Sequence, residues 1–149
     1  KPLEIEDEEE LLWSANKPPR AYEDMANSMV NCWSAFEKGE KDFINQVPLA
    51  DGLKNKGVFC FPCRAILFSD QIKKDQFQMK GFNLYLSSKK VKKNGLTYLQ
   101  FLTNDPEYKL ETDDLENDVI VADKDLYILF FAASGRSWAN IASQLLIQE

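Results

Sequence analysis

The C-terminal residues 126–146 constrain the fold more than any other part of this chain. The apolar run 126–133 is short, aromatic and partly β-branched, which predicts a buried strand. After a Ser-Gly-Arg-Ser turn, apolar side chains recur at the spacing of one helical face, at Trp138, Ile141, Ala142, Leu145 and Leu146. Such a helix is what a small barrel or sandwich needs to cover an open end. The pattern therefore predicts a β-rich domain closed by a C-terminal helix.

The N-terminal third divides into two segments. Residues 1–19 carry a run of acidic side chains that repel one another, and we expect a solvated acidic arm. Residues 20–51 are predicted as a helix and a linker, because aromatic and sulfur-containing side chains recur at helical spacing from Tyr22 to Phe36 and Gly39 then stops the run. We expect this face to pack on the remaining domain, residues 52–149. The alternative is an exposed stripe that binds a partner.

From Gly57 onward the apolar residues alternate, which indicates strands. Pro62 cannot donate to a ladder, so we expect a bend, an edge or a bulge there. The dipeptide Asn94-Gly95 predicts a hairpin turn. The expected strands cover residues 58–61, 64–68, 77–86, 96–102, 108–112, 118–121 and 126–133. The predicted fold class is therefore α+β, a small antiparallel β-barrel or sandwich of six or seven strands closed by the C-terminal helix, with the N-terminal helix packed on it.

Composition narrows the class of protein. With 149 residues and 44% hydrophobic residues, the chain is long enough for one domain with its own core. It contains no histidine, which removes Ser-His and Cys-His nucleophile pairs. Carboxylate dyads and lysine chemistry survive this exclusion, but 24 acidic residues bring carboxylates close together by chance, so we expect no enzymatic activity and no catalytic residue. No apolar stretch reaches the roughly 18 residues that span a bilayer. We therefore expect a cytoplasmic protein, able to sit peripherally at a membrane.

The three cysteines give no clear site. An odd number without framework spacing argues against a secreted disulfide scaffold and favours a reducing compartment. Cys60 and Cys63 have the spacing of half a zinc site or of a redox pair, but too few further ligands accompany them and the motif lies between β-patterned segments. We expect buried, inert cysteines, with no metal and no cofactor.

The charges are polarised along the chain, although the net charge is −6. Lysines gather at 73–93, and nine acidic residues lie within 103–125. The four lysines around the Asn94-Gly95 turn could hold a phosphorylated headgroup, an acidic peptide or a nucleic-acid backbone, or could simply form a solvated hairpin tip. The candidate ligand-binding residues are Lys54, Lys56, Arg64, Lys73, Lys74, Lys89, Lys90, Lys92 and Lys93.

Two segments carry a resemblance to a known family. Gly57-Val-Phe-Cys-Phe-Pro-Cys-Arg-Ala-Ile-Leu-Phe-Ser-Asp70 is similar to an early hairpin of pleckstrin-homology-like domains, and residues 126–133 leading to Trp138 resemble the last strand and helix tryptophan of that fold. The resemblance covers residues 52–147. Only Lys54, Lys56 and Arg64 lie where the family carries its lipid-binding basic residues.

The resemblance implies a non-enzymatic binding or scaffold module. Its ligand would be a protein partner or an anionic phosphoinositide headgroup, in GTPase or membrane signalling. A helix before such a barrel is also the layout of exchange factors that act on Rho-type GTPases.

A second hypothesis is binding of RNA or an mRNA cap. Aromatic side chains interleave with the lysines, as in domains that stack a base and hold its phosphates, at Phe77, Phe82, Tyr85, Tyr98 and Phe101. Residues 77–82 and 134–142 also resemble segments of the cap-binding domain of a viral RNA polymerase subunit, in the orthomyxoviruses. Because alternation places many of these rings on the buried face, core packing is the competing account.

Overall fold

The computed structural model describes residues 1–36, 58–92, 94–133 and 146–148. In these ranges the strands are β1 (Leu3–Ile5), β2 (Val58–Phe68), β3 (Phe77–Lys80), β4 (Val119–Ala122), β5 (Leu126–Ala133) and β6 (Leu146–Gln148). The helices are η1 (Glu8–Leu11), α1 (Arg20–Ala35), α3 (Asp70–Lys74), α4 (Phe82–Ser88), α5 (Tyr98–Thr103) and α6 (Thr112–Glu116). No helix among the described residues is long and apolar enough to cross a membrane.

The described strands form two separate small sheets. One has the order β1-β2-β5-β6, in which β2 and β5 form a long antiparallel pair and β1 runs parallel to β2. The other is the antiparallel pair of β3 and β4. The predicted closed antiparallel barrel or sandwich is therefore wrong, while the α+β class holds. Two of the segments expected to supply its strands, 82–86 and 96–102, are instead the helices α4 and α5.

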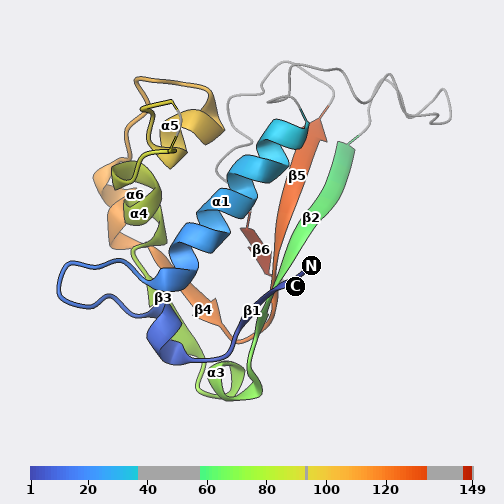
Figure 1. Ribbon diagram of the computed structural model, residues 1–149, viewed down its shortest axis with the longest axis vertical. Helices are drawn as coiled ribbons and strands as arrows, with labels where there is room; N and C mark the ends of the chain where they lie inside the picture. Colours follow the sequence, from blue (N-terminus) through green and yellow to red (C-terminus); the bar gives the residue numbers. More distant parts are fainter. Residues whose placement is uncertain (37–57, 93, 134–145, 149) are drawn as a thin grey trace, which may run out of the picture.

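Helix α1 organises the core. It begins after Pro19 and presents its apolar face at helical spacing, so that Tyr22, Met25, Met29 and Cys32 are buried. This confirms the predicted helix and its packing. Figure 1 shows α1 between the β2–β5 pair on one side and the short helices α4 and α5 on the other. The helix thus joins the two halves of the molecule.

The acidic N-terminal segment belongs to the fold. Although residues 1–19 were expected to be a solvated arm, β1 pairs with residues 66–68 of β2, and Ile5 and Leu11 are buried. The acidic side chains occupy the positions between these apolar anchors. Because apolar residues alternate with acidic ones in β1, this segment pairs with β2 in spite of its dense negative charge.

Strand β2 contains the predicted irregularity at Pro62. Its register against β5 shifts between Pro62 and Arg64, as in a β-bulge, so the two strands expected on either side of Pro62 are one strand. Strand β5 has the bounds predicted for it, and β4 covers most of the 118–121 segment. The predicted C-terminal helix, including Trp138, falls largely on residues 134–145, which lie outside the described residues, and Leu146 begins strand β6.

Candidate functional site: the groove between α1 and β2

The predicted basic residues do not form one surface. Lys73 and Lys74 lie on α3 at one end of the molecule, whereas Lys89, Lys90 and Lys92 follow α4 towards the opposite end (Figure 1). Lys54, Lys56 and Lys93 lie outside the described residues. Arg64 stands apart from both groups, on β2. Among the residues that the structure describes, the candidate set therefore falls into three separate places.

Two of these lysines already have acidic partners. The Lys73 ammonium lies 2.8 Å from the Asp125 carboxylate. The Lys92 ammonium lies 3.1 Å from the Glu23 carboxylate, and this hydrogen bond raises the pKa of Lys92. The turn at Asn94-Gly95 is present, since Val91 donates to Leu96 and Gly95 has a positive φ, but it connects α4 to α5 and not two strands.

Arg64 has a different environment. Its side chain is half-buried between β2 and α1, where one guanidinium nitrogen donates to the Ser28 hydroxyl at 2.7 Å. Nε donates to the carbonyl oxygen of Lys1 at 3.2 Å. Ser28 in turn donates to the carbonyl oxygen of Asp24 at 2.6 Å, which fixes the hydroxyl as an acceptor for Arg64. Neutral oxygens alone orient this cation within the described part of the chain.

Arg64 opens into a groove between the second half of α1 and β2. The cavity has a volume of about 650 Å³, within the usual range of ligand pockets. Ser28 and Asn31 line it from α1, and Phe61 lines it from β2 with 47% of its surface exposed. Phe36 closes the apolar end, where its ring meets Phe61 at 5.3 Å between centroids. The groove thus has a cationic end and an aromatic end.

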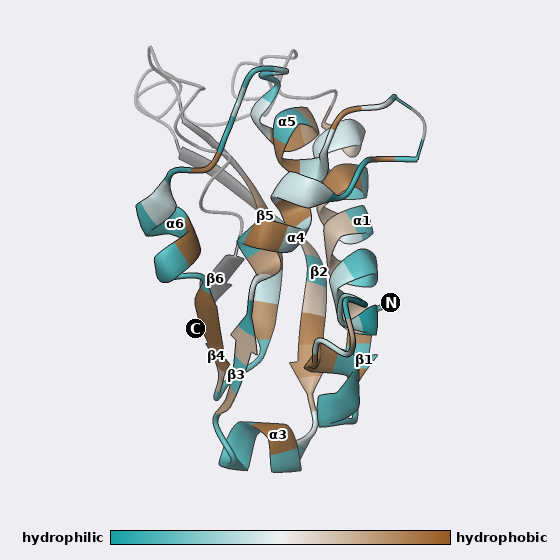
Figure 2. Ribbon diagram, turned by 90° about the vertical axis from the view of Figure 1, so that its left-hand side faces the viewer, coloured by the Kyte–Doolittle hydropathy of each residue, from teal (hydrophilic) through white to brown (hydrophobic). Residues whose placement is uncertain are grey.

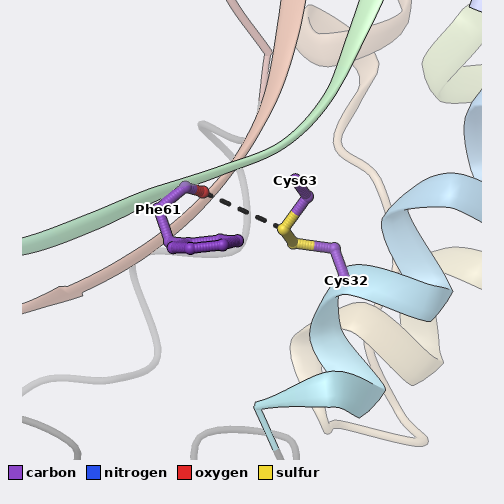
Figure 3. Close-up of a disulfide and its surroundings, with 3 residues drawn as sticks. All are labelled: Cys32, Phe61 and Cys63. Atoms are coloured by element: carbon purple, nitrogen blue, oxygen red, sulfur yellow. Dashed lines mark hydrogen bonds between the residues drawn. A yellow bond between two sulfur atoms is a disulfide. The ribbon is translucent and has the colours of Figure 1, made fainter. Parts of the chain in front are cut away.

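A disulfide crosses the groove and ties its two walls together. Cys32 on α1 is bonded to Cys63 on β2, with the two Cα atoms 5.8 Å apart (Figure 3). The Cys63 sulfur lies 3.9 Å from the carbonyl oxygen of Phe61, and Figure 3 shows the Phe61 ring beside the bond. The expectation of buried, inert cysteines is wrong for Cys32 and Cys63, because they form a disulfide. The two cysteines lie 31 residues apart in the sequence, so no local sequence motif indicates that they pair.

The side chains of the groove suit recognition of a ligand. A guanidinium offers a planar set of donors to a phosphate or carboxylate, and aromatic rings cover an apolar group beside it. No group of three or more histidine, cysteine or acidic side chains among the described residues is placed to hold a metal ion. The groove thus places the donors of one guanidinium next to an aromatic wall.

Of the five aromatic side chains proposed for base stacking, four lie in the core and Phe77 is partly buried against it. Phe82, Tyr85, Tyr98 and Phe101 are buried, and Tyr22 meets Phe82 and Tyr85 edge-on. Burial raises the pKa of the Tyr22 and Tyr85 hydroxyls well above the usual tyrosine value. Core packing, the competing account of these rings, is confirmed.

Sequence reasoning identified Arg64 but missed its neighbours. Ser28 and Asn31 lie on α1 without a local motif, and Phe61 reads as an ordinary strand residue. The available signal was Pro62, next to Phe61, since it predicts a bulge and bulges often lie next to functional sites. Comparison with protein-family models, curated proteins and solved structures finds no match to this chain.

Proposed function

We propose that this protein is a non-enzymatic binding module whose groove between α1 and β2 takes a segment of a partner protein. The segment carries a phosphate or carboxylate next to an aromatic or aliphatic side chain. One observation carries the proposal: the half-buried guanidinium of Arg64 is held by neutral oxygens at the end of a groove with an exposed aromatic ring.

The charge of Arg64 supplies the specificity. Among the described residues Arg64 has neutral acceptors in place of a carboxylate, and such acceptors return little of the hydration that a partly buried cation loses. An anionic group that enters the groove completes its hydrogen bonds, and charge-assisted bonds to arginine are about twice as strong as neutral ones. Ser28 keeps the guanidinium in place before the ligand arrives, which lowers the entropy cost of binding.

The aromatic end supplies the apolar contact. Phe61 is one of the exposed large hydrophobic residues, and its ring is positioned by Phe36, which itself stacks on Phe130 at 4.1 Å between centroids. A rigid aromatic wall gives contact area without much loss of side-chain entropy. A ligand with both groups would use the whole groove.

The basic residues favour a protein segment over a membrane or RNA. Binding to lipid headgroups or to a nucleic-acid backbone needs several cations on one face. Here the candidate lysines that the structure describes lie in two separate places, two of them pair with acids, and the chain carries a net charge of −6. A single arginine beside an aromatic wall fits one localised anionic group better than the extended charge of a membrane or a nucleic acid.

Calorimetry with small probes tests this proposal. We expect N-acetyl-phosphotyrosine amide to bind the full chain. N-acetyl-tyrosine amide, which lacks the phosphate, and inorganic phosphate, which lacks the ring, should each bind at least tenfold more weakly. Inositol trisphosphate and a cap analogue are the probes for the headgroup and RNA hypotheses. Preferential binding of either one, or no binding of the phosphotyrosine probe, would contradict the proposal.

A variant series assigns the binding to Arg64. Arg64→Gln should reduce the affinity at least tenfold, and Arg64→Lys should recover only part of it because a lysine lacks the forked geometry. Lys17→Gln is the matched control, with the same change of charge at an exposed position on the loop before α1. Melting curves of all three variants show whether the fold is retained. Equal losses in Arg64→Gln and Lys17→Gln would show that the probe senses only the overall charge.

A further inference from the structure

A second exposed apolar surface lies away from the groove. Leu84 on α4, Leu115 on α6 and Val119 on β4 are exposed by 46%, 43% and 43%. Single exposed hydrophobic residues are common on protein surfaces, but neighbouring ones mark contact sites.

Asp118 holds two of the three positions, Leu84 and Val119, together. Its carboxylate accepts hydrogen bonds from the backbone nitrogens of Asn83 and Leu84, at 3.0 and 2.9 Å. Because Asp118 directly precedes Val119, these bonds fix the start of α4 next to Val119. The carbonyl oxygen of Asp118 also accepts from Gly81 at 3.0 Å. Leu115 lies three residues earlier, on α6, which contacts α4. Figure 2 shows α4, α6 and β4 on the face of the molecule turned towards the viewer.

Acidic residues border this apolar cluster. Glu111, Asp113, Asp114 and Glu116 lie on or next to α6 and are all exposed. None of them forms an ion pair with a residue that the structure describes. We call the cluster of Leu84, Leu115 and Val119, together with these four carboxylates, the acid-rimmed surface.

We propose that the acid-rimmed surface docks a basic, amphipathic segment of a partner protein. The three apolar side chains provide a contact whose burial favours association, and the carboxylates select the sign of the charge around it. RNA and anionic membranes would be repelled by the same carboxylates. A second copy of this chain, with its own net charge of −6, would also be repelled.

The proposal is independent of the groove. The acid-rimmed surface shares no residue with the groove between α1 and β2, and its ligand carries the opposite charge. A module with both sites could hold two different segments. Because the apolar contact is small, the interaction should be weak, fast to exchange and sensitive to salt.

Fluorescence anisotropy with a labelled helical peptide of alternating leucine and lysine positions tests the surface. We expect this peptide to bind the full chain, and the same pattern with glutamate in place of lysine not to bind. Affinity for the lysine peptide should fall steeply as salt is added, since exposed charges are screened over about 10 Å at 0.1 M. Absence of binding, or equal binding of both peptides, would overturn the proposal.

Two matched pairs of variants locate the binding. Leu115→Ser should lower the affinity about fivefold, whereas Leu12→Ser, at another leucine exposed by 49%, should leave it unchanged. The double variant Asp113→Asn and Glu116→Gln should lower the affinity mainly at low salt, whereas Glu4→Gln with Glu9→Gln should have less than half that effect. All six positions are exposed, so the melting temperatures of the four variants should stay close to that of the unchanged chain. Equal effects within either pair would overturn the proposal.

Discussion

At the scale of single residues, one backbone carbonyl joins three parts of the chain. The carbonyl oxygen of Lys80 accepts hydrogen bonds from the Trp13 indole at 2.8 Å and from the Tyr22 hydroxyl at 2.7 Å. The next residue, Gly81, has a φ of 72° and separates β3 from α4. A Cβ at Gly81 would lie 3.1 Å from the Trp13 indole nitrogen. This joint therefore needs both the left-handed backbone and the missing side chain.

Alanine substitutions at Gly81 and Gly95 should separate the effect of the left-handed backbone from the effect of the contact with Trp13. Gly81→Ala should lower the free energy of unfolding by about 2 kcal/mol, from the positive φ and the displaced Trp13 ring. Gly95→Ala is the control, because Gly95 has a φ of 74° but nothing within 4 Å of the added Cβ. Urea unfolding measures both variants. An equal loss in the two would mean that the Trp13 contact contributes nothing.

Tyr22 should make the protein sensitive to alkali. Burial, and secondly the negative charge of Asp118, raise the pKa of its hydroxyl above the ordinary tyrosine value of 10.0. The unfolded chain then releases this proton at lower pH than the folded one, so the stability is complete below pH 10 and is lost as pH rises above it, by up to about 1.4 kcal/mol per pH unit.

The variant Tyr22→Phe tests this dependence. It removes the hydrogen bond to Lys80 and should cost about 1 kcal/mol at neutral pH, yet it should flatten the fall in stability above pH 10. Unfolding in urea at several alkaline pH values compares the slopes. Identical slopes for the variant and the unchanged chain would show that Tyr22 ionises equally in both states.

At the scale of elements, long patterns were predictable and short ones were not. Helix α1 and strand β5 repeat their apolar period several times, and both form as their sequences predict. In contrast, the 82–86 segment alternates in hydrophobicity, but Phe82, Tyr85 and Leu86 are buried while Leu84 is exposed, which is a helical period. Over so few residues, periods of two and of 3.6 fit equally well.

Helix α5 did carry a readable signal. The Thr97 hydroxyl accepts from the Gln100 backbone nitrogen, and the Gln100 side chain accepts from the Thr97 nitrogen, which is a capping box. The Thr-x-x-Gln spacing announces a helix start, but the preceding Asn94-Gly95 turn favoured a hairpin. A turn at this dipeptide is compatible with either element. The capping box was the stronger evidence.

The disulfide between α1 and β2 should contribute strongly to stability. Closing a loop with a sequence separation of 31 residues restricts the unfolded chain by about 3–4 kcal/mol in the entropic account. Cys63→Ser should therefore lower the melting temperature markedly, while Cys60→Ser should leave the bond intact. Of three cysteines, two are joined, so a thiol assay in denaturant should find one free thiol in the unchanged chain. Three free thiols without added reductant would contradict the pairing.

At the scale of the whole molecule, the groove exists because α1 packs along β2. Ser28 and Cys32 meet Arg64 and Cys63 only through this packing. The sequence suggested Arg64 as a ligand residue together with eight lysines, but it could not separate one from the others because charge density says nothing about depth or neighbours. For Arg64 and the five candidate lysines that the structure describes, burial, ion pairs and position make the separation.

The most direct test of the central claim is an NMR titration of the unchanged full chain with N-acetyl-phosphotyrosine amide. We predict saturable shifts of the Arg64 Nε–H resonance and of the backbone amides of Ser28, Asn31 and Cys63, all at the groove. The amides around Lys89 and Lys92 should stay unchanged. Saturable shifts confined to those lysines, or no saturable shift at Arg64, would contradict the assignment of the groove as the binding site.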